Sequence, residues 1–265
     1  MTTPRCVGKT PGVSHASRVG LVLIAGILLS VATACTASDT AGLPATRPNG
    51  GPSSTAQVDA SPDADAQIFP VPVAQWRAMR EAGMVRPGCP VQTRSELRRI
   101  EVNHLDFDGE IERGYLVANT DTAESLARIF TKLFDAGFPI QRMEGVENYD
   151  GDTLLSLRAN NTSSFNCRRK DQINAPMQES PHANGRAVDI NPRQNPWRDL
   201  RCRCWSPGPS NNARTAGPGK ILRGGVVWRA FRDEGWIWQN ISVADYMHFD
   251  TGYPSAALLR RRATP

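Results

Sequence analysis

The sequence predicts an α+β fold for its last two thirds, with a small antiparallel sheet and flanking helices. Residues 97–104 and 111–118 alternate apolar and polar side chains, which is typical of half-buried strands. The dipeptide Asp108-Gly109 between them favours a turn. Residues 120–136 instead carry apolar side chains three and four positions apart, which indicates an amphipathic helix. Helices that come first and short strands that come late in the chain together favour the α+β class.

Two helices are expected in the first half of the domain. Residues 73–84 read as a short helix. The helix over 120–136 is better defined, because Asn119 or Thr120 can cap it and a glycine and a proline follow its last turn. Its apolar face is formed by Leu126, Ile129, Phe130, Leu133 and Phe134.

The later elements are expected to be short. Residues 185–191, 236–238 and 248–250 suit short strands. Residues 226–233 suit a helix that ends before the glycine two residues on. Residues 205–219, which are rich in Pro, Gly and Asn, are expected to form an irregular loop.

The first 35 residues have the organisation of a secretory signal. Residues 2–18 contain basic side chains and no acid, and residues 19–34 are apolar or small without a charge. That apolar run has 16 residues, fewer than the roughly 20 that a membrane-spanning helix needs. A retained membrane anchor is the alternative interpretation.

Cys35 follows a run of small residues, 32–34, and this arrangement resembles a lipoprotein box. The resemblance implies that Cys35 carries lipid and becomes the mature N-terminus; ordinary signal cleavage nearby is the alternative. Residues 36–68 lack aromatic and nearly all large aliphatic side chains, so we expect a disordered tether. Residues 69–265 then form one exported domain in the cell envelope, held on the outer face of the plasma membrane.

The charge of the chain excludes a nucleic-acid-binding surface. The formal net charge is +5. It falls to +2 without the first 35 residues, which contain three basic residues and no acid. Three arginines, residues 260–262, lie in the C-terminal tail, so the body of the domain is close to neutral and offers no basic face.

Four of the six cysteines remain after Cys6 and Cys35 are set aside, and an even number in an exported domain favours two disulfides. Cys202 and Cys204 are too close in sequence to bridge each other comfortably. We therefore expect one of them to pair with Cys89 and the other with Cys167.

Two segments combine the residue types of a metal site. Residues 180–192 place His182 seven residues before Asp189, whose apolar neighbours leave its carboxylate in need of a partner or a metal. Residues 245–250 add His248. Two imidazoles and one carboxylate are sufficient for a catalytic zinc ion with a water as fourth ligand. The alternative is three unrelated packed side chains; His104, in a predicted strand, is taken as structural.

The same segments resemble a known family. Ser180, His182, Gly185, Ala187 and Asp189 form the motif S-x-H-x-x-G-x-A-x-D. This motif resembles the signature of VanY-like D-alanyl-D-alanine carboxypeptidases, within the LAS-type zinc peptidases of hedgehog-like fold. Asp245 before His248-Phe249 is similar to the second signature, as are N-T-S-S-F-N-C-R at 161–168 and G-W-x-W at 235–238. The resemblance covers about residues 155–252 and hardly touches 69–150.

The resemblance implies a role for each matching residue. His182, Asp189 and His248 would hold Zn²⁺, and Asp245 would be the general base. Arg168 would stabilise the developing oxyanion. Ser180 would bind substrate or orient the first histidine. Many relatives carry Glu as the base, and Asp in that place is similar to a branch of endopeptidases.

The resulting functional hypothesis is a zinc-dependent peptidase that acts on D-amino-acid-containing stem peptides of peptidoglycan. Removal of the terminal D-Ala is the first expectation, and cleavage at L-Ala-D-Glu or a D,D-endopeptidase reaction is the alternative. A cell-wall-binding module without catalysis, or a structural lipoprotein, is the rival from another class. The expected partners are peptidoglycan peptides and, through Cys35, the membrane; the chain is expected to be a monomer without nucleic acid.

Overall fold

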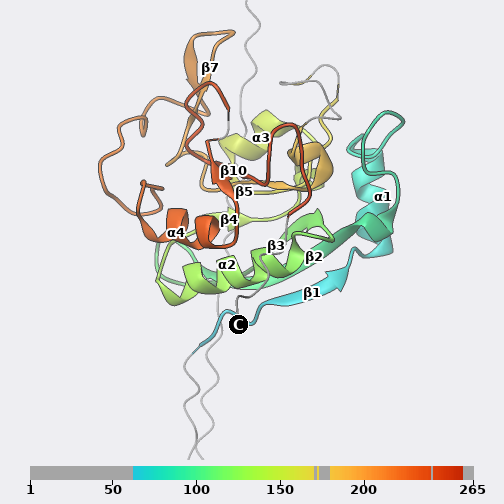
Figure 1. Ribbon diagram of the computed structural model, residues 1–265, viewed down its shortest axis with the longest axis horizontal. Coiled ribbons are helices and arrows are strands. Elements are labelled where there is room, and N and C mark those ends of the chain that lie inside the picture. Colours follow the sequence, from blue (N-terminus) through green and yellow to red (C-terminus); the bar gives the residue numbers. More distant parts are fainter. Residues whose placement is uncertain (1–61, 170–171, 173–179, 240, 259–265) are drawn as a thin grey trace, which may run out of the picture. The chain divides into compact units, whose positions relative to one another are not determined.

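The three-dimensional structure is a computed structural model, which describes residues 62–169, 172, 180–239 and 241–258 (Figure 1). The predicted signal, the lipidation site at Cys35 and most of the expected tether lie outside the described residues. Within the described ranges, no helix is both long and apolar enough to cross a membrane. The architecture is α+β, with several small sheets and short helices.

The largest sheet is antiparallel and has the order β1-β2-β3. Strands β2 (Leu97–Leu105) and β3 (Ile111–Asn119) form the hairpin that the alternating pattern predicts. Strand β1 (Gln67–Pro70) pairs with β2 and begins two residues before the expected start of the domain. Ala64, still earlier, is already buried, and its carbonyl accepts a hydrogen bond from the backbone of Asn103.

The first helix, α1 (Val73–Glu81), ends three residues earlier than expected. Its last turn is closed by hydrogen bonds from the Gly83 N–H to the Arg80 carbonyl and from the Met84 N–H to the Met79 carbonyl. This is a Schellman motif, and Gly83 takes the positive φ of 72° that the motif requires.

Helix α2 (Ala123–Asp135) confirms the predicted amphipathic helix, but its first residue was predicted wrongly. Thr122 is the N-cap residue, and neither Asn119 nor Thr120 caps the helix. Asn119 is the last residue of β3, and the Thr120 hydroxyl donates to the carbonyl of Glu96. Both residues are used by the strand and its turn, so the helix begins after them.

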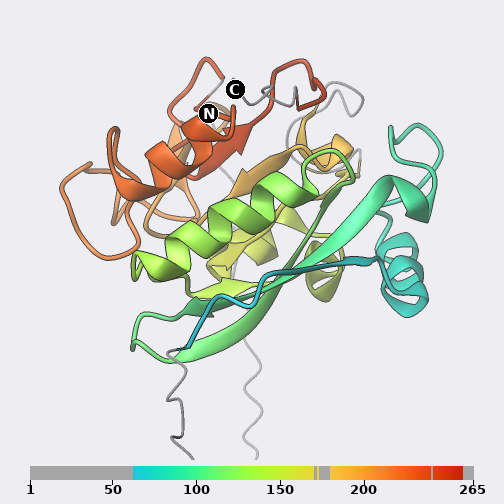
Figure 2. The ribbon, with the colours of Figure 1, turned by 60° about the horizontal axis from the view of Figure 1, so that its bottom comes forward.

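The main core lies between the first sheet and α2 on one side and the C-terminal elements on the other. Figure 2 shows α2 lying across the β2–β3 hairpin, with α4 (Val226–Asp233) beside it. Phe130 of α2 meets Phe231 of α4 edge to face. The predicted helix over 226–233 is confirmed.

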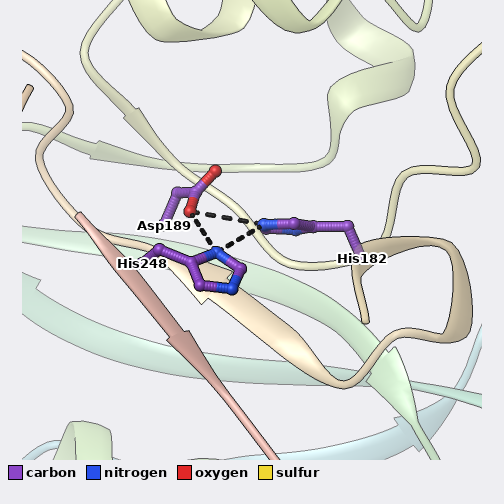
Figure 3. Close-up of side chains that lie close together, drawn as sticks. All are labelled: His182, Asp189 and His248. Carbon is purple, nitrogen blue, oxygen red and sulfur yellow. Dashed lines mark hydrogen bonds and ion pairs between the residues drawn. The ribbon is translucent and has the colours of Figure 1, made fainter. Parts of the chain in front are cut away.

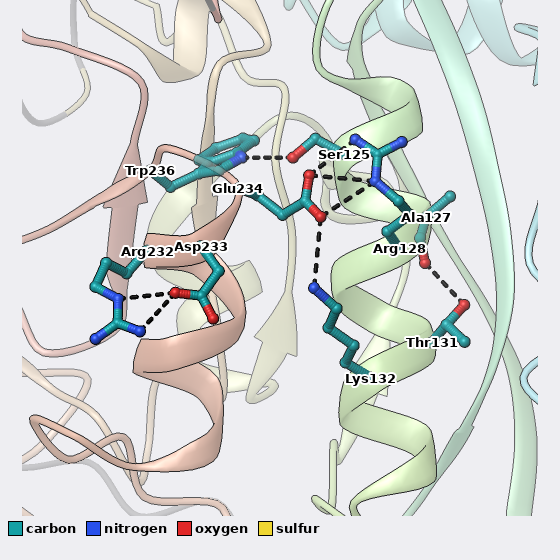
Figure 4. Close-up of polar contacts among 9 residues, drawn as sticks. All are labelled: Ser125, Ala127, Arg128, Thr131, Lys132, Arg232, Asp233, Glu234 and Trp236. Atoms are coloured by element: carbon teal, nitrogen blue, oxygen red, sulfur yellow. Dashed lines mark hydrogen bonds and ion pairs between the residues drawn. The ribbon is translucent and has the colours of Figure 1, made fainter. Parts of the chain in front are cut away.

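Polar contacts join the end of α4 to α2 (Figure 4). Glu234 accepts hydrogen bonds from Arg128 at 2.8 Å and from Lys132 at 3.5 Å. The buried indole of Trp236 donates to the Ser125 hydroxyl at 2.9 Å. These contacts hold residues 234–236 against α2, and the chain continues from there into the second sheet.

The second sheet has the order β6-β10-β9 and is antiparallel. Its strands are β6 (Ala187–Asp189), β9 (Ile237–Trp238) and β10 (His248–Asp250). All three fall within the predicted short strands.

The remaining elements were not predicted. Strands β4 (Arg142–Met143) and β5 (Asn161–Thr162) are parallel, and β7 (Trp197–Asp199) pairs with β8 (Cys204–Ser206). Strand β8 therefore occupies the start of the expected loop over 205–219. The other elements are α3 (Thr153–Arg158) and the 3-10 turns η1 (Arg94–Glu96), η2 (Val146–Tyr149) and η3 (His182–Asn184).

The disulfide pairing predicted from the sequence is wrong. Cys89 bonds to Cys167 in a second buried cluster, and Cys202 bonds to Cys204 at the exposed turn between β7 and β8. Arg203 between the latter two has a positive φ of 53°, and this turn brings their Cα atoms to 5.1 Å. A Cα separation of that size is within the range that a disulfide spans.

Candidate metal centre and active site

Three different elements position the predicted ligands. Asp189 and His248 lie directly opposite each other in the antiparallel pair of β6 and β10. His182 begins η3, and Gly185, the residue that caps the end of η3, has a positive φ of 66°. A Cβ at Gly185 would lie 2.6 Å from the backbone nitrogen of Asn119, so the motif glycine lets this turn approach β3.

The three side chains converge on one point (Figure 3). His182 Nε2 lies 3.1 Å from His248 Nδ1 and 3.3 Å from Asp189 Oδ1, and His248 Nδ1 lies 3.2 Å from Asp189 Oδ1. Zinc bonds of about 2.0–2.1 Å place neighbouring ligand atoms of a tetrahedron about 3.3–3.4 Å apart. The triangle of nitrogen and oxygen atoms therefore has the size of one face of a zinc coordination tetrahedron.

The outer nitrogens of both imidazoles decide which atoms face the centre. His182 Nδ1 lies 2.7 Å from the carbonyl oxygen of Ser164, and His248 Nε2 lies 3.0 Å from Asp250 Oδ2. Both partners only accept hydrogen bonds, so each outer nitrogen carries the N–H. In neutral imidazoles the inner nitrogens then present lone pairs. Two lone pairs and a carboxylate oxygen that converge in a buried place fit a divalent cation.

The charges of Asp189 and His248 also agree with a site that fits a divalent cation. Burial works to raise the pKa of Asp189, but His182 and His248 outweigh it and hold that pKa well below its usual range. Burial works to lower the pKa of His248, but hydrogen bonds to Asp189 and Asp250 raise it to about 10. A proton on His248 and a metal ion therefore compete for the same position, because a metal-binding imidazole must be neutral.

Asp245 precedes His248 in the segment that leads into β10. Its backbone forms an isolated bridge with Trp197, and its Oδ1 atom is buried without a hydrogen-bond partner among the described residues. Burial raises its pKa to about 7; the Asp189 charge adds to this, and His248 and Arg168 oppose it. A carboxyl group that titrates near neutral pH is suited to proton transfer.

Arg168 brings a cation to the same place. Arg86 donates hydrogen bonds to the carbonyls of Cys167 and Arg168, so the disulfide and Arg86 together fix this backbone. Burial lowers the pKa of Arg168, and the charges of Asp189 and Asp245 oppose this. Its Nε has no hydrogen-bond partner among the described residues. It lines a cavity of about 20 Å³ with Asp189 and Asp245, which is large enough for one water.

A cleft of about 700 Å³ opens beside the three converging side chains. His182 and His248 line it, together with Arg168, Ser180 and Asp245. Asp189 lies behind them at the small cavity. The structure thus brings all six predicted site residues together. His104 is buried within β2, away from this cleft, in agreement with a structural role.

Two members of the site were not found by sequence reasoning. The Ser164 carbonyl and the fully buried Asp250 orient the two imidazoles. A signal for Asp250 existed, because residues two apart in a strand point to the same face and Asp250 follows His248 at that spacing. The Ser164 carbonyl has no such signal, since any residue supplies a carbonyl.

Comparison with known proteins gives a family match over the region that contains the predicted ligands. Residues 174–251 match the family described as D-alanyl-D-alanine carboxypeptidase. The match confirms the resemblance to VanY-like carboxypeptidases and supports a peptidase of this peptidoglycan-related family. It covers less than a third of the chain; it includes His182, Asp189, Asp245 and His248, and Arg168 lies before it. No curated protein and no solved structure matches this chain.

Proposed function

We propose that this protein is a zinc-dependent D-alanyl-D-alanine carboxypeptidase that trims stem peptides of peptidoglycan. One observation carries the proposal: His182 Nε2, His248 Nδ1 and Asp189 Oδ1 converge at 3.1–3.3 Å inside the segment that matches the carboxypeptidase family. The open cleft beside them gives a peptide access to the centre. A structural zinc site would be closed by a fourth protein ligand.

In this mechanism His182, Asp189 and His248 would hold the ion. Zinc held there would supply a bound water with a pKa of about 7, a nucleophile at neutral pH for the peptide carbonyl. Asp245, which faces the same cleft, takes the proton of the attacking water and hands it to the leaving amine. The guanidinium of Arg168 stabilises the negative charge that develops on the carbonyl oxygen.

The proposal extends to the place of action. A signal over residues 1–35, lipid on Cys35 and a tether would hold the peptidase domain at the outer face of the plasma membrane, next to its substrate. The small net charge of the body agrees with a peptide substrate and gives no surface for nucleic acid.

The test uses the full-length protein in detergent with a pentapeptide muropeptide, with zinc or with chelator, and reads the products by mass spectrometry. Loss of one alanine that chelator abolishes is the expected result. Chelator-sensitive cleavage inside the stem would assign the endopeptidase alternative. Absence of any product from a zinc-loaded protein would contradict the peptidase proposal and favour a wall-binding module.

A variant tests the proton-transfer role separately. Asp245→Asn is expected to keep zinc and lose most turnover, because an amide cannot accept the proton. The matched control is Asp233→Asn, which removes an exposed carboxylate paired with Arg232 on α4. Wild-type turnover in Asp245→Asn would rule out the role of Asp245 as base.

A further inference from the structure

Three arginines line the cleft, and they differ in the charges that neutralise them. Arg168 is buried close to Asp189 and Asp245. Arg201 holds Asp199 in a two-pronged ion pair at 2.6 and 3.0 Å. Arg198, the third of these arginines, forms no ion pair and no side-chain hydrogen bond with any residue that the structure describes.

Arg198 is nevertheless held in place. It is the middle residue of β7, and its N–H donates to the Ala244 carbonyl at 2.7 Å, next to Asp245. Its guanidinium carbon lies 5.7 Å from the ring centre of Trp205 in β8. Trp205 in turn stacks on Tyr246 with ring centres 5.5 Å apart.

This stack leaves the N–H groups of Arg198 for another partner. A cation over an aromatic face uses the ring as an electrostatic support and does not occupy the hydrogen-bonding edge of the guanidinium. Arg214 lies 4.4 Å from the ring centre of Tyr246, so the Trp205–Tyr246 stack that supports Arg198 also contacts a second guanidinium. The guanidinium of Arg198 is thus supported by an aromatic ring, and its five N–H donors have no acceptor among the described residues. His182 and His248 line the same cleft.

The carboxylates of the cleft do not pair with the guanidinium of Arg198. Asp199 is taken by Arg201, and Asp245 lies among the charges of Arg168 and His248. A guanidinium matches the planar geometry of a carboxylate and binds it through two parallel hydrogen bonds. We propose that Arg198 is a specificity-determining residue that binds a carboxylate of the substrate, an inference that rests on the proposed peptidase function.

Two sources could supply this carboxylate: the C-terminus of the peptide, or a carboxylate within the stem such as that of D-Glu. The test therefore compares the free pentapeptide with two derivatives, one amidated at the C-terminus and one amidated at the D-Glu carboxylate. Each is assayed with zinc-loaded wild type, Arg198→Gln and Arg203→Gln. Arg203→Gln is the matched control, because Arg203 lies in the same hairpin and does not line the cleft.

Wild type is expected to cleave one amidated derivative about 10- to 100-fold less efficiently than the free peptide. This range corresponds to the loss of a hydrogen bond to a charged group. In Arg198→Gln, kcat/KM for the free peptide should fall by the same factor. The derivative that wild type cleaves poorly should be cleaved equally well by Arg198→Gln and by wild type. The derivative that wild type discriminates against identifies the carboxylate. Arg203→Gln should behave as wild type. An equal loss on all three peptides in Arg198→Gln would overturn the proposal.

A binding measurement separates this proposal from the proposed function. Calorimetry with chelator-treated, metal-free protein measures peptide affinity without turnover. Arg198→Gln should bind the free pentapeptide more weakly by the same factor, and Arg198→Lys should recover part of the loss. Unchanged affinity would contradict the role of Arg198, whereas normal binding by a wild type that never cleaves would contradict only the peptidase reaction.

Discussion

Asp250 Oδ2 lies 3.0 Å from His248 Nε2, so a buried carboxylate supports the imidazole from the side opposite to Asp189. Asp250 Oδ1 also accepts the N–H of Gly252 at 2.9 Å, which fixes the carboxylate itself. We predict that Asp250→Ala weakens zinc binding by about 10- to 100-fold, because the imidazole loses its orienting acceptor. Asp250→Asn retains an acceptor oxygen and should lose less. Competition with a chromophoric chelator measures both; equal affinity in wild type and Asp250→Ala would contradict the prediction.

Zinc binding should release a proton from His248. The pKa of His248 is raised to about 10 by its hydrogen bonds to Asp189 and Asp250, so the metal-free imidazole is protonated at pH 8. The bound imidazole must be neutral, so affinity should rise about tenfold for each unit of pH below that pKa. At pH 8.5 Asp245, with a pKa of about 7, is already ionised and adds little. Calorimetry in two buffers of different ionisation enthalpy counts the protons. A count near zero would show that His248 is neutral before the metal binds.

The two disulfides should contribute very differently to stability. Cys89 and Cys167 are 78 residues apart, and Cys202 and Cys204 are two apart. On the loop-entropy model the first contributes about 4.5 kcal/mol to the free energy of unfolding and the second about 1.5 kcal/mol. Denaturant unfolding of Cys89→Ala/Cys167→Ala and Cys202→Ala/Cys204→Ala checks this order. A larger loss in the second pair would mean that the β7–β8 hairpin stabilises the domain through contacts rather than loop closure.

Glu147 should make stability depend on pH. Burial raises its pKa; hydrogen bonds from Gln75 and Tyr115 oppose burial without cancelling it. The native state then binds the proton more tightly than the unfolded chain, so stability falls as pH rises above the ordinary glutamate value of about 4.3. Glu147→Gln removes the buried charge and should raise the melting temperature at pH 7 but not at pH 4. Thermal unfolding of metal-free protein at both pH values provides the comparison, and an equal effect at both would exclude ionisation as the cause.

The parts of the fold that sequence patterns predict are those that local periodicity determines. The β2–β3 hairpin, α2 and α4 each bury one face, so the spacing of their apolar residues carries the signal. Strand β1 has no such signal, since all four of its residues are exposed. The cap of α2 moved to Thr122 because pairing with Leu97 keeps Asn119 in β3, and such pairing depends on a partner strand.

In the candidate site, too, local motifs reveal some residues, and contacts with distant parts of the chain determine the rest. His182, Asp189, Asp245 and His248 stand in short motifs, so their types and spacing could be seen together. The environment that sets their chemistry comes from distant chain. Cys89 reaches Cys167 beside Arg168, and Trp197 pairs with Asp245. The prediction that Cys202 pairs outward failed because sequence distance does not reveal a left-handed turn at Arg203.

The pairing of β6 with β10 links coordination to strand alignment. Asp189 faces His248 in this pair, and Phe249 at the next position stacks on Phe231 in the core with ring centres 4.1 Å apart. A shift of β10 by one residue would put Met247 or Phe249 opposite Asp189 and turn the imidazole to the other face of the sheet. Such a chain would keep its sheet and lose its ligand triangle. On the proposed function, the zinc content of a purified sample would report the fraction of molecules in which β10 pairs with β6 in this register.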